Sequence, residues 1–303
     1  MTKTIKEIFV VFFVMSIWCM SCQNRPKKNL HSNNQFVVTS KESDTAAWTK
    51  PNSITVTCDE YATVKTELGI FANNVWNKKA AGNKKWSQCI VKKTVGNSTI
   101  YGWSWSWPYG KTVIFGYPQI KVGSSPWDPE PKFDERFPMV ISQLERLNVS
   151  IDVETSSNGN YNLATSMWLI SEPNQGSKPN KSIIAAEIMF WTYATVGQFN
   201  PAGQKYGEVI VAGESWEVWY EKNWSDASFV NKNRWVYISF KAKKMAFKTN
   251  INALELLRYA IQEKLISENL LIADIELGNE VMSGKGTTWV QDFKIQTELK
   301  SFD

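Results

Sequence analysis

The sequence predicts an all-β protein in which two sheets pack as a sandwich. Apolar residues alternate with polar ones in several short segments, turn-forming residues separate these segments, and one segment alone follows a helical period. Many short strands with a single helix favour a two-sheet sandwich over an α/β fold. Residues 53–303 are expected to form this sandwich, because their number suits one all-β domain.

The alternation is clearest at residues 147–154, where every second side chain is apolar. Residues 235–240 and 216–220 repeat the pattern, with aromatic side chains on both faces of the second segment. Turns are predicted at 157–160, 201–203 and 110–111. From Asn250 onward the apolar residues follow a helical period, so Asn250 is predicted to cap a helix.

The N-terminal residues 1–22 are predicted to be an export signal. Lys3 and Lys6 precede an apolar stretch that is too short to span a bilayer comfortably. The stretch ends at Cys22, in a context that resembles a bacterial lipobox, so Cys22 is expected to become an acylated membrane anchor. An ordinary signal peptide cleaved nearby is the alternative.

Residues 23–52 are rich in Asn, Ser, Thr and Lys and are expected to form a flexible tether. The protein is therefore predicted to be an exported, membrane-anchored bacterial lipoprotein, facing either the periplasm or the cell surface. Its partners would be the membrane and a substrate, and we expect it to be a monomer.

The residue composition excludes several kinds of binding and catalysis. The net charge is +5, but the lysines are spread along the chain, which argues against nucleic-acid binding. His31 is the one histidine and lies in the tether, which excludes Ser-His-Asp catalysis, Cys-His catalysis and His-ligated zinc within the domain. We expect no metal and no cofactor. Carboxylates remain as the natural acid–base groups.

Residues 185–191 combine an apolar strand pattern with one central carboxylate. Side chains alternate between the faces of a strand, so Glu187, Met189 and Trp191 share one face, while Ile188 and Phe190 point to the core. Glu187, Met189 and Trp191 together suit a sugar-binding cleft with a reactive carboxylate. A purely structural buried Glu is the alternative.

Glu280 follows a second apolar segment and precedes a Gly-rich turn. Strand parity places Glu276, Gly278 and Glu280 on one face, and Ile275 and Leu277 on the core face. Adjacent antiparallel strands could bring Glu187 and Glu280 together. A retaining glycosidase needs two carboxyl groups about 5 Å apart. A solvated turn residue is the alternative for Glu280.

Six segments, in order along residues 55–297, resemble those of glycoside hydrolase family 12. They are Asn73–Trp76, Trp105–Trp107 with Tyr117–Pro118, Tyr161–Asn162 with Trp168–Leu169, Glu187–Trp191, Gly213–Trp219 and Gly278–Glu280. The resemblance implies a jelly-roll β-sandwich of two antiparallel sheets with one helix and a concave substrate cleft. It implies that Glu187 is the nucleophile and Glu280 the acid/base. The residues expected to bind the substrate are Asn74, Trp76, Trp105, Trp107, Asn162, Ser166, Met189 and Trp191.

One position departs from the family pattern. Many members carry an Asp that contacts the nucleophile four residues after the Asn of the Tyr-Asn segment, where this chain has Ser166. A Ser can donate a hydrogen bond but cannot share a proton as a carboxyl pair can. Cys58 and Cys89 flank the first segment, as the family's N-terminal disulfide does, and oxidation is expected in an exported domain. Two separately buried thiols are the alternative.

These features predict a retaining endo-β-1,4-glucanase that acts on β-glucan. A xyloglucan-specific enzyme is the first alternative, since related sequences differ in whether the cleft admits xylose branches. A sugar-binding lipoprotein without catalytic activity is the second.

Overall fold

The computed structural model describes residues 52–110, 113–174, 176–197, 200–225 and 233–301. All of them belong to one of two compact units, Asp44–Asp303. The predicted export signal, the acylated Cys22 and almost all of the predicted tether lie outside the described residues. Within the part of the chain described, no helix is long and apolar enough to cross a membrane.

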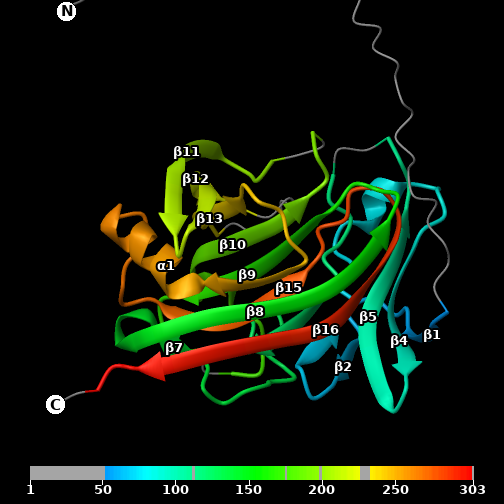
Figure 1. Cartoon of the computed structure of the whole chain (residues 1–303), viewed down its shortest axis with the longest axis horizontal. Coiled ribbons are helices and arrows are strands. Elements are labelled where there is room, and N and C mark those ends of the chain that lie inside the picture. Colours follow the sequence, from blue (N-terminus) through cyan, green and yellow to red (C-terminus); the bar gives the residue numbers. More distant parts are fainter. Residues whose placement is uncertain (1–51, 111–112, 175, 198–199, 226–232, 302–303) are drawn as a thin grey trace, which may run out of the picture. The chain divides into compact units, whose positions relative to one another are not determined.

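Strands make up most of the described elements (Figure 1). In chain order they are β1 (Ile54–Thr57), β2 (Thr63–Lys65), β3 (Ile70–Ala72), β4 (Ser87–Val95), β5 (Ser98–Trp107), β6 (Gln119–Gly123), β7 (Met139–Val140), β8 (Leu144–Ser157), β9 (Asn162–Ile170), β10 (Ile184–Ala194), β11 (Gln204–Val211), β12 (Glu214–Trp224), β13 (Trp235–Ala242), β14 (Lys248–Asn252), β15 (Leu271–Gly278) and β16 (Gly284–Leu299). Three short 3-10 turns and the helix α1 (Ala253–Gln262) complete the described elements.

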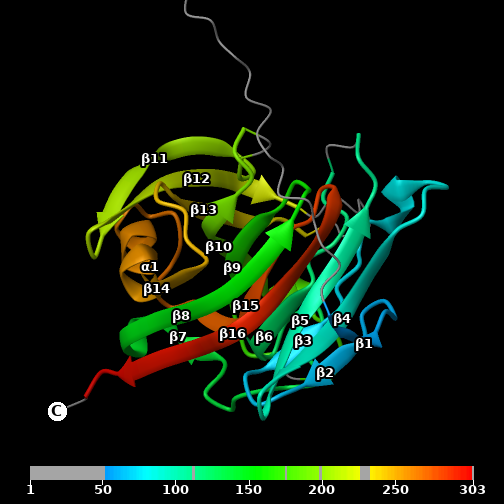
Figure 2. The same cartoon turned by 45° about the vertical axis from the view of Figure 1, so that its right-hand side comes forward.

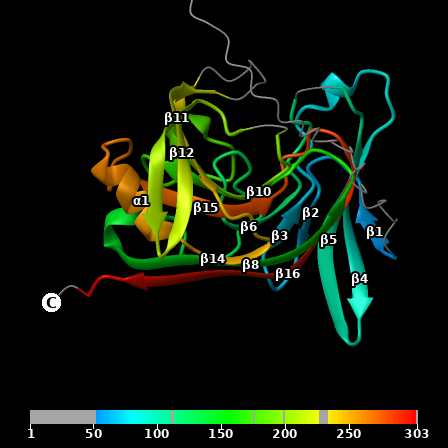
Figure 3. The ribbon, with the colours of Figure 1, turned by 45° about the horizontal axis from the view of Figure 1, so that its top comes forward.

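The strands form two sheets, which confirms the predicted all-β fold. The smaller sheet has six strands in the order β1-β4-β5-β16-β8-β14. The larger has ten strands in the order β11-β12-β13-β10-β9-β15-β6-β3-β2, with β7 paired to β15. The long strands β8 and β16 run side by side in every view, and β11, β12 and β13 form one end of the larger sheet (Figures 2 and 3).

One strand pair differs from the predicted antiparallel arrangement. β10 and β13 are parallel, with Glu187 in register with Tyr237. The chain passes through the hairpin β11–β12 before β13 inserts between β12 and β10. β13 is antiparallel to β12, and this order leaves it running in the same direction as β10.

The hydrophobic core lies between the sheets. From Leu147 to Val153 every second residue of β8 is buried, as the alternation predicted. Ile188 and Phe190 of β10 reach the same core from the larger sheet and are fully buried. The other face of the larger sheet, which we call the outer face, therefore receives the alternate side chains.

The helix begins two residues later than predicted. Asn250 lies in β14, where it pairs with Ser150, and Asn252 caps α1 by accepting a hydrogen bond from the backbone N–H of Glu255 at 3.3 Å. The Asn252 side chain thus satisfies one of the backbone donors that a helix leaves open at its start, so the cap belongs at Asn252. Sheet pairing keeps Asn250 extended.

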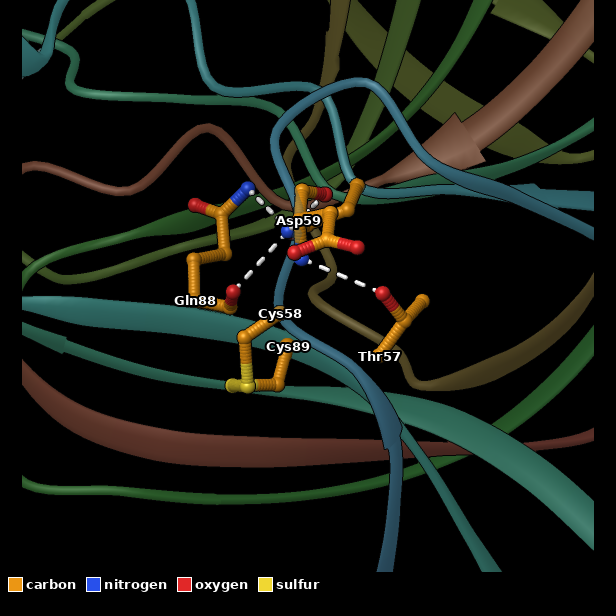
Figure 4. The surroundings of a disulfide bond; sticks show 6 residues. Thr57, Cys58, Asp59, Gln88 and Cys89 are labelled. Carbon is orange, nitrogen blue, oxygen red and sulfur yellow. Dashed lines mark hydrogen bonds between the residues drawn. A yellow bond between two sulfur atoms is a disulfide. The ribbon is translucent and has the colours of Figure 1, made fainter.

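The predicted disulfide between Cys58 and Cys89 is confirmed. It joins the segment after β1 to β4 (Figure 4). Asn73 ties the same region together, since its Nδ2 donates to the carbonyl oxygens of Asp59 at 3.0 Å and Gln88 at 2.9 Å. The family segment that begins at Asn73 is therefore held by a covalent bond and by buried hydrogen bonds.

Candidate active site

Glu187 lies on the outer face, in the middle of β10. Its half-buried carboxylate accepts a hydrogen bond at 3.1 Å from the indole Nε1 of Trp235, the first residue of β13. The ring of Trp235 packs edge-on against Trp168 and Trp127, with centroids 5.7 Å away in both cases. This indole cluster fixes the donor, so the orientation of the Glu187 carboxylate is set by packing as well as by its own strand.

Sequence reasoning did not identify Trp235. Its strand was predicted, but aromatic residues occur on both faces of the neighbouring segments, so nothing in the pattern distinguished a hydrogen-bond donor from a core residue. Trp235 comes two residues before Tyr237, the register partner of Glu187, so its approach to the carboxylate is visible only once the parallel pairing of β10 and β13 is known.

Glu280 lies just beyond the end of β15, beside Asn162 at the start of β9. The side chain of Asn162 makes two contacts with it: Nδ2 donates to the Glu280 carboxylate, and Oδ1 accepts from the Glu280 backbone N–H at 2.8 Å. The predicted site residue Asn162 therefore holds the carboxylate and the backbone of Glu280 together.

Asn279 anchors the same turn to the opposite sheet. Its Oδ1 accepts hydrogen bonds at 2.7 Å from Nε1 of Trp103 and at 2.7 Å from Oγ1 of Thr288, and its Nδ2 donates to the Asn162 carbonyl at 2.7 Å. All four residues are fully buried or nearly so. These hydrogen bonds tie the turn to strands of both sheets.

Burial raises the pKa of Glu280 to about 7, and the hydrogen bond from Asn162 opposes this rise. Loss of water around the carboxyl group is the main cause of this rise, because burial disfavours the charged form. A carboxyl group with a pKa near 7 is available as a general acid at neutral pH. Glu280 is therefore suited to donate a proton.

Glu187 and Glu280 both influence the pKa values of two buried tyrosines. Burial raises the pKa of Tyr117, and the charges of Glu276, Glu280 and Glu187 raise it further. Burial, Glu280 and Glu187 likewise raise the pKa of Tyr237. Glu187 and Glu280 are not on adjacent strands as expected, because β9 lies between β10 and β15. Both carboxylates belong to one electrostatic environment nonetheless.

Met189 and Trp191 follow Glu187 on the outer face, as strand parity predicted. They form a cluster with Ala164, Ala194 and Tyr237, separate from the main core. Asn74 belongs to the first family segment, and its Nδ2 donates to Oε1 of Gln119 at 3.5 Å. Trp76 is 38 % exposed, and an exposed indole can stack on a sugar ring.

The structure corrects the expectation for Trp105 and Trp107. Both belong to the core between the sheets and are almost fully buried. Trp107 stacks on Trp86 and Phe115 with centroids 4.4 Å and 4.6 Å away, and its Nε1 donates to Gln88. Alternate residues of β5 face the core, and burying large indoles there is strongly favourable. These two residues pack the fold and do not line the outer face.

Two buried carboxyl groups on β15 were not among the predicted site residues. Asp274 and Glu276 point to the outer face, while Ile275 between them lies in the core. Glu276 is in register with Ser166 on one side and with Lys121 on the other. Two carboxylates alternating within an otherwise apolar strand were a visible signal of a buried polar cluster.

Among the described residues no group of His, Cys, Asp and Glu has the arrangement of a metal site. The chemistry that the outer face offers is that of carboxyl groups: one carboxylate held by an indole donor and one carboxyl group whose pKa lies near 7. Such a pair on one face of a β-sandwich is typical of a glycoside hydrolase.

The model of glycosyl hydrolase family 12 matches residues 70–298. The chain belongs to this family, and it is an endoglucanase- or xyloglucanase-type hydrolase. A probable xyloglucan-specific endo-beta-1,4-glucanase A from Aspergillus terreus is 24% identical over 237 residues, which cover 76% of this chain and 82% of the relative.

Solved structures show the same fold. A native family 12 xyloglucanase from Bacillus licheniformis superposes with a TM-score of 0.67 at 23% identity, covering 81% of this chain and 100% of that one. Endoglucanase 3 from Trichoderma harzianum superposes with a TM-score of 0.63 at 18% identity, covering 82% of this chain and 100% of its own. The fold of the described residues, a sandwich of two sheets, is thus shared with these family 12 enzymes.

Proposed function

We propose that the protein is an endo-acting, retaining β-1,4-glucanase. Glu187 attacks the anomeric carbon of the glucan while Glu280 protonates the departing oxygen. Glu280 then removes a proton from the water that releases the glycosyl-enzyme. The observation that supports this division of roles is the contrast between the two sites. Glu187 accepts an indole hydrogen bond, whereas Glu280 has a pKa of about 7.

The nucleophile assignment is tested by Glu187→Gln, which keeps the size of the side chain but removes its nucleophilic oxygen. We expect turnover to fall by several orders of magnitude. A Glu187→Gly variant supplied with azide and an activated glycoside should form a glycosyl azide of inverted configuration. The wild-type enzyme should release product with β configuration, and an α-anomer as its first product in proton NMR would refute the retaining mechanism.

Substrate preference within β-glucans is the finer question. Xyloglucan is the second candidate substrate, since the relatives from Aspergillus terreus and Bacillus licheniformis are named for it. Reducing-sugar release from xyloglucan, mixed-linkage β-glucan and carboxymethyl cellulose separates the two candidates. If only xyloglucan is hydrolysed, the enzyme is a xyloglucan-specific endo-β-1,4-glucanase and the broader assignment as a β-1,4-glucanase is wrong. A purely sugar-binding role is disfavoured by membership of a hydrolase family together with both carboxyl groups.

We also propose that the enzyme is an exported lipoprotein that works as a monomer. The proposal of a lipoprotein is based on the sequence alone: a basic and then apolar segment ends at Cys22 and is followed by a polar stretch. Sedimentation of the purified domain tests the monomer, and protease treatment of intact cells distinguishes a periplasmic from a surface location.

A further inference from the structure

Tyr117 lies beside the general acid at the start of β6. A β-bridge between Gly116 and Val281 extends the antiparallel ladder of β6 and β15. Tyr117 follows Gly116 and Glu280 precedes Val281, so Tyr117 and Glu280 are opposite each other in this ladder. Opposite residues of an antiparallel pair project from the same face of the sheet. The side chain of Tyr117 therefore starts on the outer face, next to Glu280.

The ring of Tyr117 occupies the space that Gly278 leaves open. Gly278 lies between Glu276 and Glu280 on the outer face of the β15 segment. A Cβ atom at Gly278 would lie 2.8 Å from Cε2 and 2.9 Å from Cζ of Tyr117. Any larger residue would displace the ring, so the glycine allows Tyr117 to lie across β15.

The hydroxyl group of Tyr117 reaches β9. It donates a hydrogen bond to the carbonyl oxygen of Ala164 at 2.8 Å. Ala164 is in register with Gly278 on one side and with Trp191 on the other. It also belongs to the cluster that contains Met189 and Trp191. Tyr117 thus extends from β6 to the residues of β9 and β10 that are predicted to bind the sugar.

The backbone of Tyr117 contacts another predicted site residue. Its N–H donates to the carbonyl oxygen of Asn74 at 2.9 Å. Asn74 is two residues from the exposed Trp76. Tyr117 is therefore a neighbour of three separate parts of the predicted site: the segment of Asn74 and Trp76, the general acid Glu280, and the cluster around Trp191.

The hydroxyl group of Tyr117 can accept one more hydrogen bond. Its hydrogen is donated to Ala164, and the oxygen keeps an acceptor position. Burial raises the pKa of Tyr117, and four nearby carboxyl groups raise it further, so the phenol stays protonated. The side chain is 7% exposed, compared with 3% for Met189 and 2% for Trp191. A neutral acceptor beside the general acid suits a sugar hydroxyl group, which is a donor.

We propose that Tyr117 is a further substrate-binding residue, whose oxygen accepts a hydrogen bond from a hydroxyl group of a sugar next to the bond that is cleaved. This inference rests on the proposed function, because it takes the outer face as the glucan-binding surface and Glu280 as the general acid. The contact forms when the substrate binds. Its loss therefore weakens binding and leaves the chemical step almost unchanged.

The test is Tyr117→Phe, which keeps the ring over Gly278 and removes only the hydroxyl group. Binding of cellotetraose is measured by titration calorimetry in the Glu187→Gln background. We expect Kd to rise about five- to tenfold, as for the loss of one neutral hydrogen bond. In the active enzyme KM should rise by the same factor, while kcat stays within about threefold.

The matched control is Tyr101→Phe on β5 of the smaller sheet, where the tyrosine ring packs against Phe71. This variant should leave Kd and KM unchanged. Circular dichroism checks that both variants are folded at the assay temperature.

Substrates that lack one hydroxyl group separate binding from a structural role. A set of aryl β-cellobiosides, each without one hydroxyl group, is compared with the parent compound. For one of them the fall in kcat/KM should be about fivefold or more in the wild type and less than twofold in Tyr117→Phe. For the others the fall should be the same in both enzymes. A hydroxyl group that only ties β6 to β9 would alter no single compound.

An unchanged Kd in Tyr117→Phe would overturn the inference, as would an equal fall in kcat/KM for every compound in the two enzymes. The proposed function fails separately, if Glu187→Gln stays active or the wild type inverts configuration.

Discussion

Asn162 is expected to set the pH at which activity is lost on the alkaline side. Its Nδ2 hydrogen bond favours the ionised form of Glu280 and so opposes the rise of the pKa to about 7. Asn162→Ala removes this donor. A hydrogen bond to a charged group contributes about 1.5 to 3 kcal/mol, which corresponds to about one to two pKa units. Since the smaller side chain admits water, we expect a rise of about one unit.

The direction in which the alkaline limb of the pH profile moves follows from the role of Glu280 as general acid. It must be protonated when substrate binds, so kcat/KM falls as the pH rises through its pKa. A higher pKa moves this alkaline limb to higher pH. The absolute rate of Asn162→Ala is expected to be lower at every pH, because the Glu280 backbone also loses its contact with Oδ1. The position of the limb, and not the height of the profile, is therefore the diagnostic quantity.

The assay is kcat/KM on a soluble β-glucan from about pH 5 to 9. Asn250→Ala is the matched control, because this Asn accepts a hydrogen bond from Ser150 on the smaller sheet. Its profile should coincide with that of the wild type. An alkaline limb that stays in place or moves to lower pH in Asn162→Ala would show that Glu280 is not the group that titrates.

Four further changes test other parts of the structure. Trp235→Phe removes the indole donor to Glu187 and should lower kcat about tenfold or more; because the ring is buried the melting temperature should also fall, and circular dichroism checks that the variant is folded at the assay temperature. Cys89→Ser opens a loop closed over a separation of 31 residues and should lower the unfolding free energy by about 3 to 4 kcal/mol in denaturant titration; an unchanged midpoint would contradict this. Trp76→Ala should raise KM and leave the melting temperature unchanged, whereas a loss of stability would place this Trp in the core. Cys22→Ala should abolish fatty-acid labelling and detergent partitioning while activity on soluble glucan survives, and an unlabelled wild type would reject the anchor.

Strand parity predicted the faces of β10 and β15 from sequence, because one face of each is almost continuously apolar. The resemblance to the family, in contrast, gave Trp105 and Trp107 a substrate-binding role, although both are buried in the core. An indole suits a core and a sugar platform equally, and the Trp-Ser alternation does not say which face is inward. The disulfide between Cys58 and Cys89 was predicted from the resemblance to the family, and the structure confirms it.

Contacts between distant segments were the hardest to anticipate. The donor role of Trp235 depends on a parallel pairing that no local pattern encodes. The position of the helix cap depended on competition between two Asn residues, and sheet pairing decided it for Asn252.

The anchoring of Asn279 makes the catalytic acid sensitive to the contact between the two sheets. Trp103 and Thr288, which hold this Asn, belong to strands of the sheet that bears neither catalytic carboxyl group. If the sheets separate, the turn that presents Glu280 loses two of its hydrogen bonds at once. Heat inactivation should therefore coincide with global unfolding, and enzymatic activity can serve as a direct readout of whether the sandwich is closed.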